Sequence, residues 1–262
     1  MLTTIEHLDG SYLPAHKNVY FASDFHLGVP SQKVSLEREK KIVRWLTSIQ
    51  ESAAVVFLLG DLFDFWFEYK YVIPKGFIRL QGKLAELTDN GIPVIIFTGN
   101  HDMWMFDYFN LELGISIYHT PQSVRINNKQ FYIGHGDGLG PGDHQFKILK
   151  KFFRSSFCQR LFALLPPRVG MGIAHYWSAK SRDKNHVLDK QFLGKENEWI
   201  YRYCQQLEAQ RHHDYYILGH RHLPLDMEIN TNSRYINLGE WMSDHTYAVF
   251  DGKNVQLLHF EG

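Results

Sequence analysis

The stretch AAVVFLLGDLFD, residues 53–64, places an uninterrupted apolar run directly before a polar cluster. The run 53–59 is far shorter than the ~20 apolar residues of a membrane-spanning helix and has the length of a strand buried on both faces. Gly60 then allows a tight turn, and Asp61 follows it. The stretch therefore predicts a buried strand that presents an acidic side chain at its carboxyl end.

The same arrangement recurs four times elsewhere in the chain. Apolar runs at 19–22, 92–97, 130–133 and 215–218 each stop at a cluster that contains aspartate, asparagine or histidine. Apolar residues with helical spacing over 36–49 and 77–87 predict helices between the first three runs. Alternating strands and helices indicate an α/β layered fold, in which functional residues gather at the carboxyl ends of the strands.

Seven side chains in these clusters carry donor atoms suited to a divalent cation. They are Asp24, His26, Asp61, Asn100, His135, His220 and His222. A single histidine after a strand is more often a hydrogen-bonded imidazole, but five clusters in this order favour metal binding. Carboxylates with imidazoles suit manganese, iron, zinc or cobalt. Seven donors exceed the needs of one tetrahedral ion, so we predict two divalent ions bridged by Asp61, an arrangement that holds two metals ~4 Å apart around a phosphoryl oxygen.

Charge and cysteine content exclude other kinds of protein. The 28 basic residues balance the 28 acidic ones, which argues against a protein that grips nucleic acid with its whole surface. Cys158 and Cys204 are far apart and form no CxxC motif, so a cysteine-built zinc site is excluded and a reducing compartment is favoured. The N-terminal residues lack the pattern of a secretory signal, so we expect a cytoplasmic location.

The ordered motifs D-x-H, GD, GNH, HGD and GHxH, which span Asp24 to His222, resemble the calcineurin-like metallophosphoesterase family. The resemblance implies a single domain over 1–262, built as a four-layer αββα sandwich with metals at the strand ends. By similarity one ion is held by Asp24, His26, Asp61 and His222, and the other by Asp61, Asn100, His135 and His220. His101 matches the histidine that assists the leaving group or the transition state, and Asp102 is expected to orient it.

Segments beside the motifs resemble one branch of that family, the enzymes of lipid A biosynthesis that cleave the pyrophosphate bond of UDP-2,3-diacylglucosamine. These segments are GDLFDFW (60–66), HGDGLGPGD (135–143), SRDKN (181–185), GHRHLP (219–224) and LGEW (238–241). This resemblance implies manganese as the metal and metal-hydroxide attack on the α-phosphorus, with UMP and 2,3-diacylglucosamine 1-phosphate as products. Substrate contacts are expected from Asn100, Asp143, Ser181 and Asn185. The best-known members carry arginine at the position of His101.

The chain between the fourth and fifth motifs differs from the rest. Earlier motifs follow one another at 35–39 residues, whereas His135 and His220 are 85 apart, so we expect a helical insertion at 140–205. Residues 143–184 hold nine basic and two acidic residues, and apolar residues with helical spacing continue from Phe146 to Leu165, before two prolines. A packed cap is the simplest interpretation. A lid over acyl chains, with a basic rim at the inner-membrane surface, is compatible with it.

Other interpretations of the insertion and the site remain open. A nucleic-acid platform is disfavoured because leucine and phenylalanine dominate the insertion, so no nucleic-acid partner is expected. Within the enzyme class, the alternative is a phosphodiesterase, nuclease or phosphoprotein phosphatase acting on another phosphoester. Outside it, the alternative is a metal-free binding scaffold, which the presence of all seven donors disfavours.

Overall fold

A computed structural model describes residues 4–140, 144–185, 191–192 and 194–262 of the chain. Its larger sheet has six strands in the order β11-β10-β1-β2-β3-β4, of which the last four are parallel. The strands are β1 (Asn18–Ala22), β2 (Ala53–Leu59), β3 (Val94–Phe97), β4 (Ser116–Tyr118), β10 (Thr246–Phe250) and β11 (Val255–His259). The three runs predicted as strands in the first half of the chain thus lie side by side and point the same way.

A second sheet of five strands packs against the first, in the order β5-β6-β7-β9-β8. Its strands are β5 (Gln122–Ile126), β6 (Lys129–Ile133), β7 (Tyr215–Leu218), β8 (Pro224–Asn230) and β9 (Ser233–Leu238). The rings of Phe21 in β1 and Phe131 in β6 stack across the gap between the sheets, with centroids 6.1 Å apart. The core between the sheets therefore joins the two halves of the chain.

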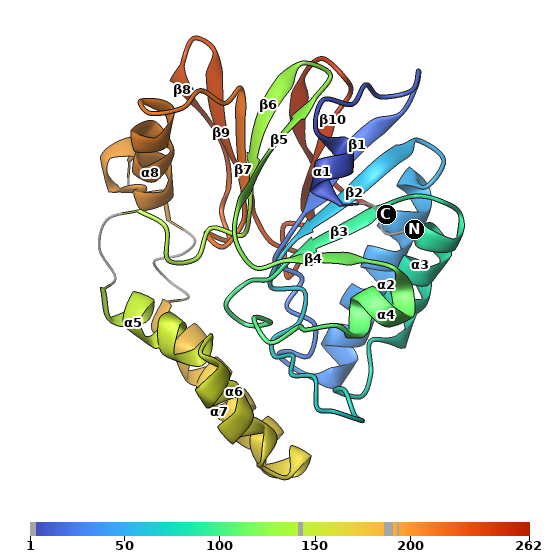
Figure 1. Cartoon of the computed structure of the whole chain (residues 1–262), viewed down its shortest axis with the longest axis vertical. Helices are drawn as coiled ribbons and strands as arrows, with labels where there is room; N and C mark the ends of the chain where they lie inside the picture. The colour runs from blue at the N-terminus through green and yellow to red at the C-terminus, as the bar shows by residue number, and fades with distance from the viewer. Residues whose placement is uncertain (1–3, 141–143, 186–190, 193) are drawn as a thin grey trace.

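Helices cover the outer faces of both sheets (Figure 1). The larger sheet carries α2 (Gln32–Ile49), α3 (Ile78–Asp89) and α4 (Tyr108–Leu113), and α8 (Trp199–Glu208) covers the second sheet. Short helices α1 (Ile5–Leu8) and η1 (Lys195–Asn197) lie outside these layers. Tyr20 faces α2 while its neighbour Phe21 faces the second sheet, so both faces of β1 are buried. The predicted four-layer αββα sandwich is confirmed.

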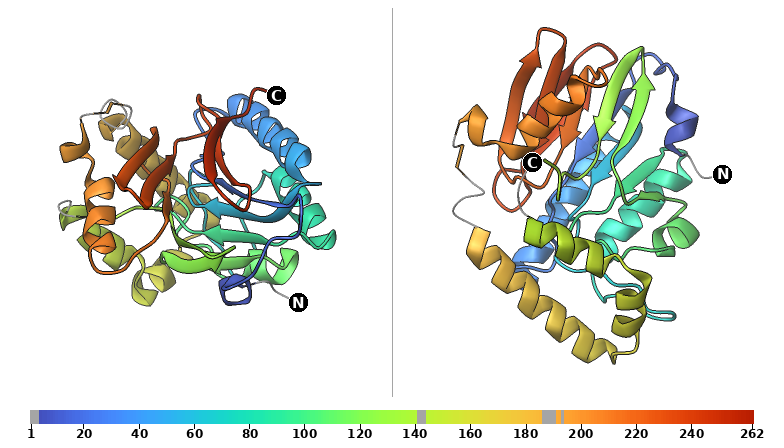
Figure 2. Two further views of the ribbon diagram at one scale, coloured as in Figure 1. Left: turned by 90° about the horizontal axis from the view of Figure 1, so that it is seen from above. Right: turned by 60° about the vertical axis from the view of Figure 1, so that its left-hand side comes forward.

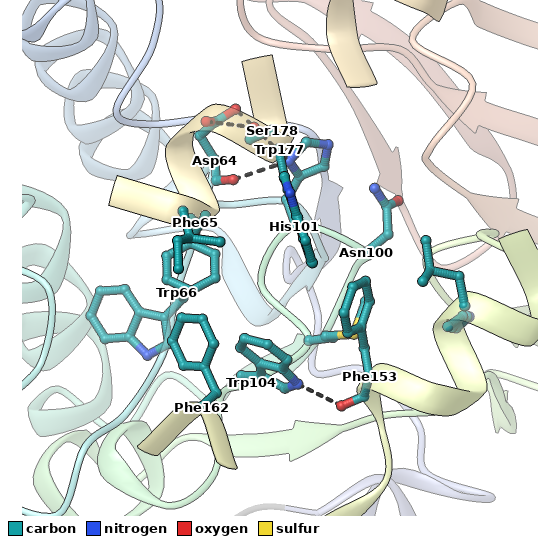
Figure 3. A pocket seen from close by; sticks show the side chains of 15 residues that line it. Asp64, Phe65, Trp66, Asn100, His101, Trp104, Phe153, Phe162, Trp177 and Ser178 are labelled. Atoms are coloured by element: carbon teal, nitrogen blue, oxygen red, sulfur yellow. Dashed lines mark hydrogen bonds and ion pairs between the residues drawn. The ribbon is translucent and has the colours of Figure 1, made fainter. Parts of the chain in front are cut away.

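Three helices project from the sandwich as a lid, defined here as α5 (His144–Phe153), α6 (Ser156–Ala163) and α7 (Pro167–Asn185) (Figures 1 and 2). A pocket lies between this lid and the sandwich (Figure 3). The apolar pattern expected to form one helix up to the prolines is divided at Ser155, whose side chain caps α6 by accepting a hydrogen bond from Cys158 N. The range 140–205 thus contains the lid and also the first seven residues of α8, which belongs to the sandwich.

Within the described ranges, no helix combines the length and the apolar character required to cross a membrane. The longest, α7 with 19 residues, contains several charged residues near its end.

Candidate metal centre and adjoining pocket

All seven predicted metal donors meet at the carboxyl ends of their strands, between the two sheets. Asp24 and His26 follow β1, Asp61 follows β2, and Asn100 follows β3; His135 follows β6, and the pair His220 and His222 follows β7. Five of these residues have a left-handed backbone, which is rare outside glycine: Asp24, His26, Asp61, His220 and His222. Such strained backbone is typical of functional sites, because the surrounding fold must hold it in place.

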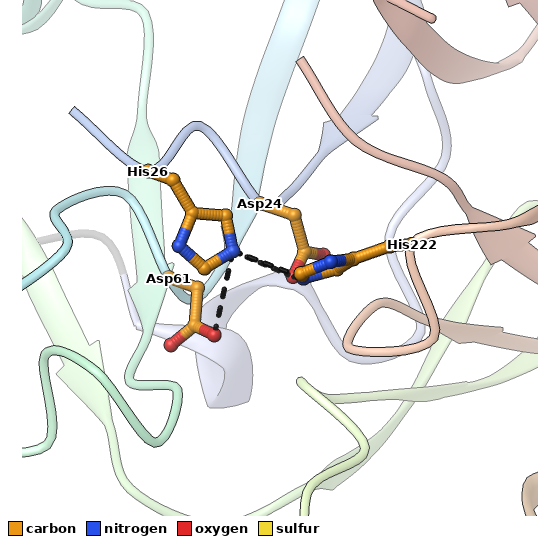
Figure 4. Close-up of side chains that lie close together, drawn as sticks. All are labelled: Asp24, His26, Asp61 and His222. Atoms are coloured by element: carbon orange, nitrogen blue, oxygen red, sulfur yellow. Dashed lines mark hydrogen bonds and ion pairs between the residues drawn. The ribbon is translucent and has the colours of Figure 1, made fainter. Parts of the chain in front are cut away.

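The first group of donors consists of Asp24, His26, Asp61 and His222 (Figure 4). The Nε2 atoms of His26 and His222 are 3.0 Å apart, and His222 Nε2 is 3.1 Å from Asp24 Oδ1. Asp24 and His26 are fully buried, and Asp61 is 1 % exposed. Two imidazole nitrogens and a buried carboxylate directed at one point form a donor set that fits a divalent cation.

The second group is built around His135, on the side of Asp61 toward the second sheet. His135 Nε2 lies 3.3 Å from both Asp61 Oδ2 and Asn100 Oδ1, and the His135 and His220 rings have centroids 5.2 Å apart. His135 Nδ1 donates to the Leu59 carbonyl at 2.7 Å, so Nε2 is the nitrogen directed at the site. This backbone bond orients the ring in the way usual for a metal-binding histidine.

Asp61 connects the two groups. Its Oδ2 is 3.8 Å from His26 Nε2 and 3.3 Å from His135 Nε2, so a single carboxylate oxygen faces both. Its Oδ1 accepts a hydrogen bond from the His101 backbone at 2.8 Å. This is the position expected of a bridging ligand.

Glycines allow the ligand loops to approach closely. A Cβ on Gly99 would lie 2.1 Å from Asp61 Oδ1, and one on Gly60 would lie 2.6 Å from the Gly99 nitrogen. Asp102 then ties the two loops together, because its carboxylate accepts backbone N–H groups of Gly99 and Leu62, each at 2.7 Å. The contacts of Asp102 are thus with the backbone of the loops, whereas the His101 ring, which it was expected to orient, contacts Asp64 and Ser178.

Protonation equilibria in the cluster reflect its concentrated negative charge. Burial lowers the pKa of His135, but the adjacent Asp61 outweighs burial and raises that pKa to about 10. Burial and the neighbouring Asp61 together raise the pKa of Asp102 to about 7. Burial and the positive charge of His135 lower the pKa of His220 to about 4. Buried carboxylates that favour a proton on an adjacent imidazole favour a cation in its place, because ligands give up protons to bind metals.

A largely apolar cavity of about 390 Å³ adjoins the donor cluster (Figure 3). Asn100 and His101 line it on the side of the donors. Its remaining walls are mostly aromatic and aliphatic side chains of the sandwich loops and the lid: Phe65, Trp66, Met103, Trp104, Leu149, Phe153, Phe162, Ile173 and Trp177. Trp104 Nε1 donates to the Phe153 carbonyl at 2.8 Å, which ties α5 to the sandwich.

Several residues of the pocket were not among the predicted site residues. Conversely, some of the predicted substrate contacts fall outside what the structure describes. Trp104 follows the GNHD motif closely, so its position beside a ligand loop was an available signal. Asp64 stands three residues after Asp61 in the same polar cluster, so its position near the site was also an available signal. Its bond to Ser178 had no such signal, since 114 residues separate the two. Of the expected substrate contacts, Ser181 and Asn185 lie on α7 with side chains outside the described part, and Asp143 lies outside the described residues.

Comparison with known proteins agrees with this geometry. The family model for calcineurin-like phosphoesterases matches residues 17–224. A protein of Porphyromonas gingivalis named UDP-2,3-diacylglucosamine hydrolase is 35 % identical over 255 residues, covering 93 % of this chain and 97 % of that protein. One of the same name from Pectobacterium carotovorum is 26 % identical over 245 residues, covering 92 % and 98 %.

Among solved structures, Vacuolar Protein Sorting 29 from Cryptosporidium parvum is 14 % identical, with a TM-score of 0.45, and the match covers 95 % of this chain and 100 % of that one. The family assignment depends on the matched family model, on the P. gingivalis relative and on the donor cluster between the two sheets. The chain belongs to the calcineurin-like phosphoesterase family.

Proposed function

We propose that this protein hydrolyses the pyrophosphate bond of UDP-2,3-diacylglucosamine to UMP and 2,3-diacylglucosamine 1-phosphate. The observation that carries the proposal is the apolar cavity whose wall includes Asn100 and His101 of the donor cluster. A substrate that joins two acyl chains to a pyrophosphate needs an apolar space directly beside phosphate-binding donors. The name shared by the two bacterial relatives supports the same substrate.

Two divalent ions, proposed to be manganese, complete the proposed site. Iron, zinc and cobalt suit the same donors. One ion is assigned to Asp24, His26, Asp61 and His222, and the other to Asp61, Asn100, His135 and His220. When bound, the ions supply charge stabilisation for the phosphoryl oxygens and lower the pKa of water to near neutrality.

The chain's own residues orient the substrate and exclude water. His101 lies at the boundary between the donors and the cavity. Its proposed role is to stabilise the negative charge that develops on the phosphate as the bond between the α-phosphorus and the bridging oxygen breaks. The lid residues Phe153 and Trp177 line the cavity and are proposed to exclude water once the acyl chains are bound. Asn100, Asp143, Ser181 and Asn185 are proposed to contact the sugar and the phosphates.

The lid is also proposed to hold the protein at an anionic membrane, on the cytoplasmic face of the inner membrane. Its described helices, and Leu164 directly after α6, expose large apolar side chains that do not line the cavity; those on the helices are Ile148, Phe152, Phe157, Leu161 and Val169. Exposed Lys151, Arg160 and Arg168 accompany them. Apolar side chains with basic neighbours are the usual composition of a helix that lies in a lipid interface.

A comparison of substrates tests the proposal. The assay measures UMP release from UDP-2,3-diacylglucosamine and from UDP-glucosamine, and the cleavage of bis(p-nitrophenyl) phosphate, with manganese present. We expect the acylated substrate to be preferred in kcat/KM by at least about 10²-fold, because burial of its acyl chains holds the pyrophosphate at the donors. Turnover of the aryl ester alone, with no gain from acyl chains, would show that the substrate is a different phosphoester.

A further inference from the structure

A serine of the lid reaches a buried aspartate beside the donor cluster (Figure 3). Ser178 of α7 donates from Oγ to Asp64 Oδ2 at 2.7 Å. Both residues are buried, with 8 % and 1 % of their surfaces exposed. Asp64 lies in the segment that follows β2 and Asp61, so this bond joins the lid directly to one of the ligand loops.

The same two residues hold the ring of His101. His101 Nδ1 lies 3.0 Å from the Asp64 carbonyl oxygen and 3.3 Å from Ser178 Oγ. A carbonyl oxygen only accepts hydrogen bonds, so Nδ1 is a protonated nitrogen and Nε2 remains available to the site. The His101 ring stands edge-on to His26, with centroids 4.9 Å apart. Asp64 and Ser178 therefore set both the orientation and the protonated nitrogen of a ring beside the proposed metals.

The shape of α7 explains how Ser178 reaches this position. Gly170, Ala174 and Ser178 follow one another at intervals of four residues, so they share one face of the helix, and all three are buried. A Cβ on Gly170 would lie 2.4 Å from the Tyr69 hydroxyl. The small residues let this face of α7 approach the sandwich, while Tyr176 on the same helix is 66 % exposed.

We propose that Ser178 is a positioning residue: by holding Asp64 and the Nδ1 side of His101, it directs His101 Nε2 at the substrate phosphate. The site is then fully assembled only when α7 is seated on the sandwich. The proposal rests on the role given to His101 under the proposed function, and it adds a direct connection between the lid and the reacting group.

Single substitutions give the first test. Ser178→Ala removes the hydroxyl, and we expect kcat to fall about tenfold while KM changes less than about twofold, because a misdirected group costs rate more than ground-state binding. Ser178→Thr retains the hydroxyl and should recover most of the kcat. Tyr176→Phe is the matched control, since it removes a hydroxyl from an exposed position of the same helix, and kcat should not change.

A double-mutant cycle separates positioning from a general structural effect. The kcat of wild type, Ser178→Ala, His101→Ala and the double variant are compared, with thermal melts showing that each is folded. If Ser178 acts through His101, Ser178→Ala produces little further loss once His101 is absent. If Ser178→Ala lowers kcat by the same factor with and without His101, or if it leaves kcat unchanged in the wild-type background, the proposal is overturned.

The cycle is measured on UDP-2,3-diacylglucosamine and on bis(p-nitrophenyl) phosphate. A wild-type protein that cleaves only the aryl ester contradicts the proposed substrate, and the cycle on that ester still decides the role of Ser178. The two proposals therefore fail in distinguishable ways.

Discussion

Asp61 has the central position among single residues, because its Oδ2 faces His26 at 3.8 Å and His135 at 3.3 Å. The other donors each belong to one group, so loss of one of them removes a ligand from one ion only. Loss of the Asp61 carboxylate removes a ligand from both. The residue is also buried, which leaves little room for water to replace it.

Asp61→Asn is therefore expected to abolish the proposed metal centre while the fold persists. Metal analysis of the purified protein should fall from about two ions per chain to fewer than one, and activity should fall at least about 10³-fold, since the ions stabilise the developing charge. Asp9→Asn, at an exposed position outside the donor cluster, is the control and should retain both ions. Full metal content in Asp61→Asn would contradict the bridging role.

Gly99→Ala tests the close approach of the ligand loops. The new Cβ would meet Asp61 atoms, including the backbone nitrogen at 2.7 Å, so the loops must separate. We expect the free energy of unfolding to fall by about 2 kcal/mol, as for other overpacked sites, together with loss of activity. In Gly82→Ala, on α3 where a Cβ meets nothing within 4 Å, urea unfolding should show a gain of about 0.5–1 kcal/mol. The same change in the free energy of unfolding in both variants would show that the Gly99 site is not tightly packed.

The seven donors could be predicted from sequence because each directly follows a buried strand, and parallel strands end at the same edge. The contacts of the His101 ring could not be predicted from the sequence. Its ring is held by Ser178, which reaches it only through the three-dimensional seating of α7, and no local spacing encodes that approach. Asp102 was expected to orient His101, but its carboxylate accepts the Gly99 and Leu62 backbone N–H groups, contacts that depend on the geometry of the loops.

Among the elements of the sandwich, the apolar patterns predicted five strands, β1, β2, β3, β6 and β7, and two helices, α2 and α3, within a few residues. The remaining strands and the helices α4 and α8 were not predicted. The strand run at 92–97 begins later in the structure, at Val94, and the helix expected at 36–49 begins earlier, at Gln32 after the cap Ser31. The division between α5 and α6 was not predicted, because apolar residues with helical spacing continue across it. The helix is interrupted at Ser155, whose side chain caps α6. The spacing of apolar residues does not indicate this break.

The attachment of α8 to the second sheet should depend on pH through Glu208. Its carboxylate accepts bonds from the Tyr216 hydroxyl at 2.8 Å and the His213 backbone at 2.9 Å. Burial raises the pKa of Glu208, but hydrogen bonds, led by those from His212 and the His213 backbone, outweigh burial and lower it to about 2. The folded-state pKa lies below the ordinary value of 4.5, so the stabilisation is complete above that value and is lost as pH falls toward 2.

Glu208→Gln should accordingly lower the free energy of unfolding at pH 7 by about 2 kcal/mol, the scale of hydrogen bonds to a charged group. Urea unfolding at pH 7, 5 and 3.5 measures the difference from wild type, which should be constant between pH 7 and 5 and smaller at pH 3.5. Glu112→Gln, at an exposed position of α4, should show no such dependence. A difference that grows toward low pH would contradict the assignment.

At the scale of the whole molecule, the formal net charge of zero conceals an uneven distribution. Residues 143–184 carry nine of the 28 basic residues and only two of the 28 acidic ones, so the rest of the chain is acidic. The lid built from this segment also exposes Phe157 and Leu161, at 67 % and 49 %. A basic and apolar projection on an acidic body gives the molecule one face suited to an anionic lipid surface.

Co-sedimentation with lipid vesicles tests this surface. The protein should bind vesicles containing phosphatidylglycerol more tightly than pure phosphatidylcholine, and Phe157→Ser with Leu161→Ser should weaken binding about tenfold by removing apolar anchors. Leu111→Ser is the matched control, since Leu111 is 72 % exposed on α4, outside the lid. Equal binding to both lipid compositions, or an equal loss of vesicle binding in the control variant, would show that the lid does not bind the membrane.

A metal titration of the metal-free protein, with UMP release from UDP-2,3-diacylglucosamine as the readout, tests whether two bound ions are required for hydrolysis. We expect negligible release without metal, and a rise with added manganese that levels off at about two equivalents per chain, because two ions share Asp61. Saturation at one equivalent, full release by the metal-free protein, or no UMP at any metal concentration would rule out hydrolysis by a two-metal site.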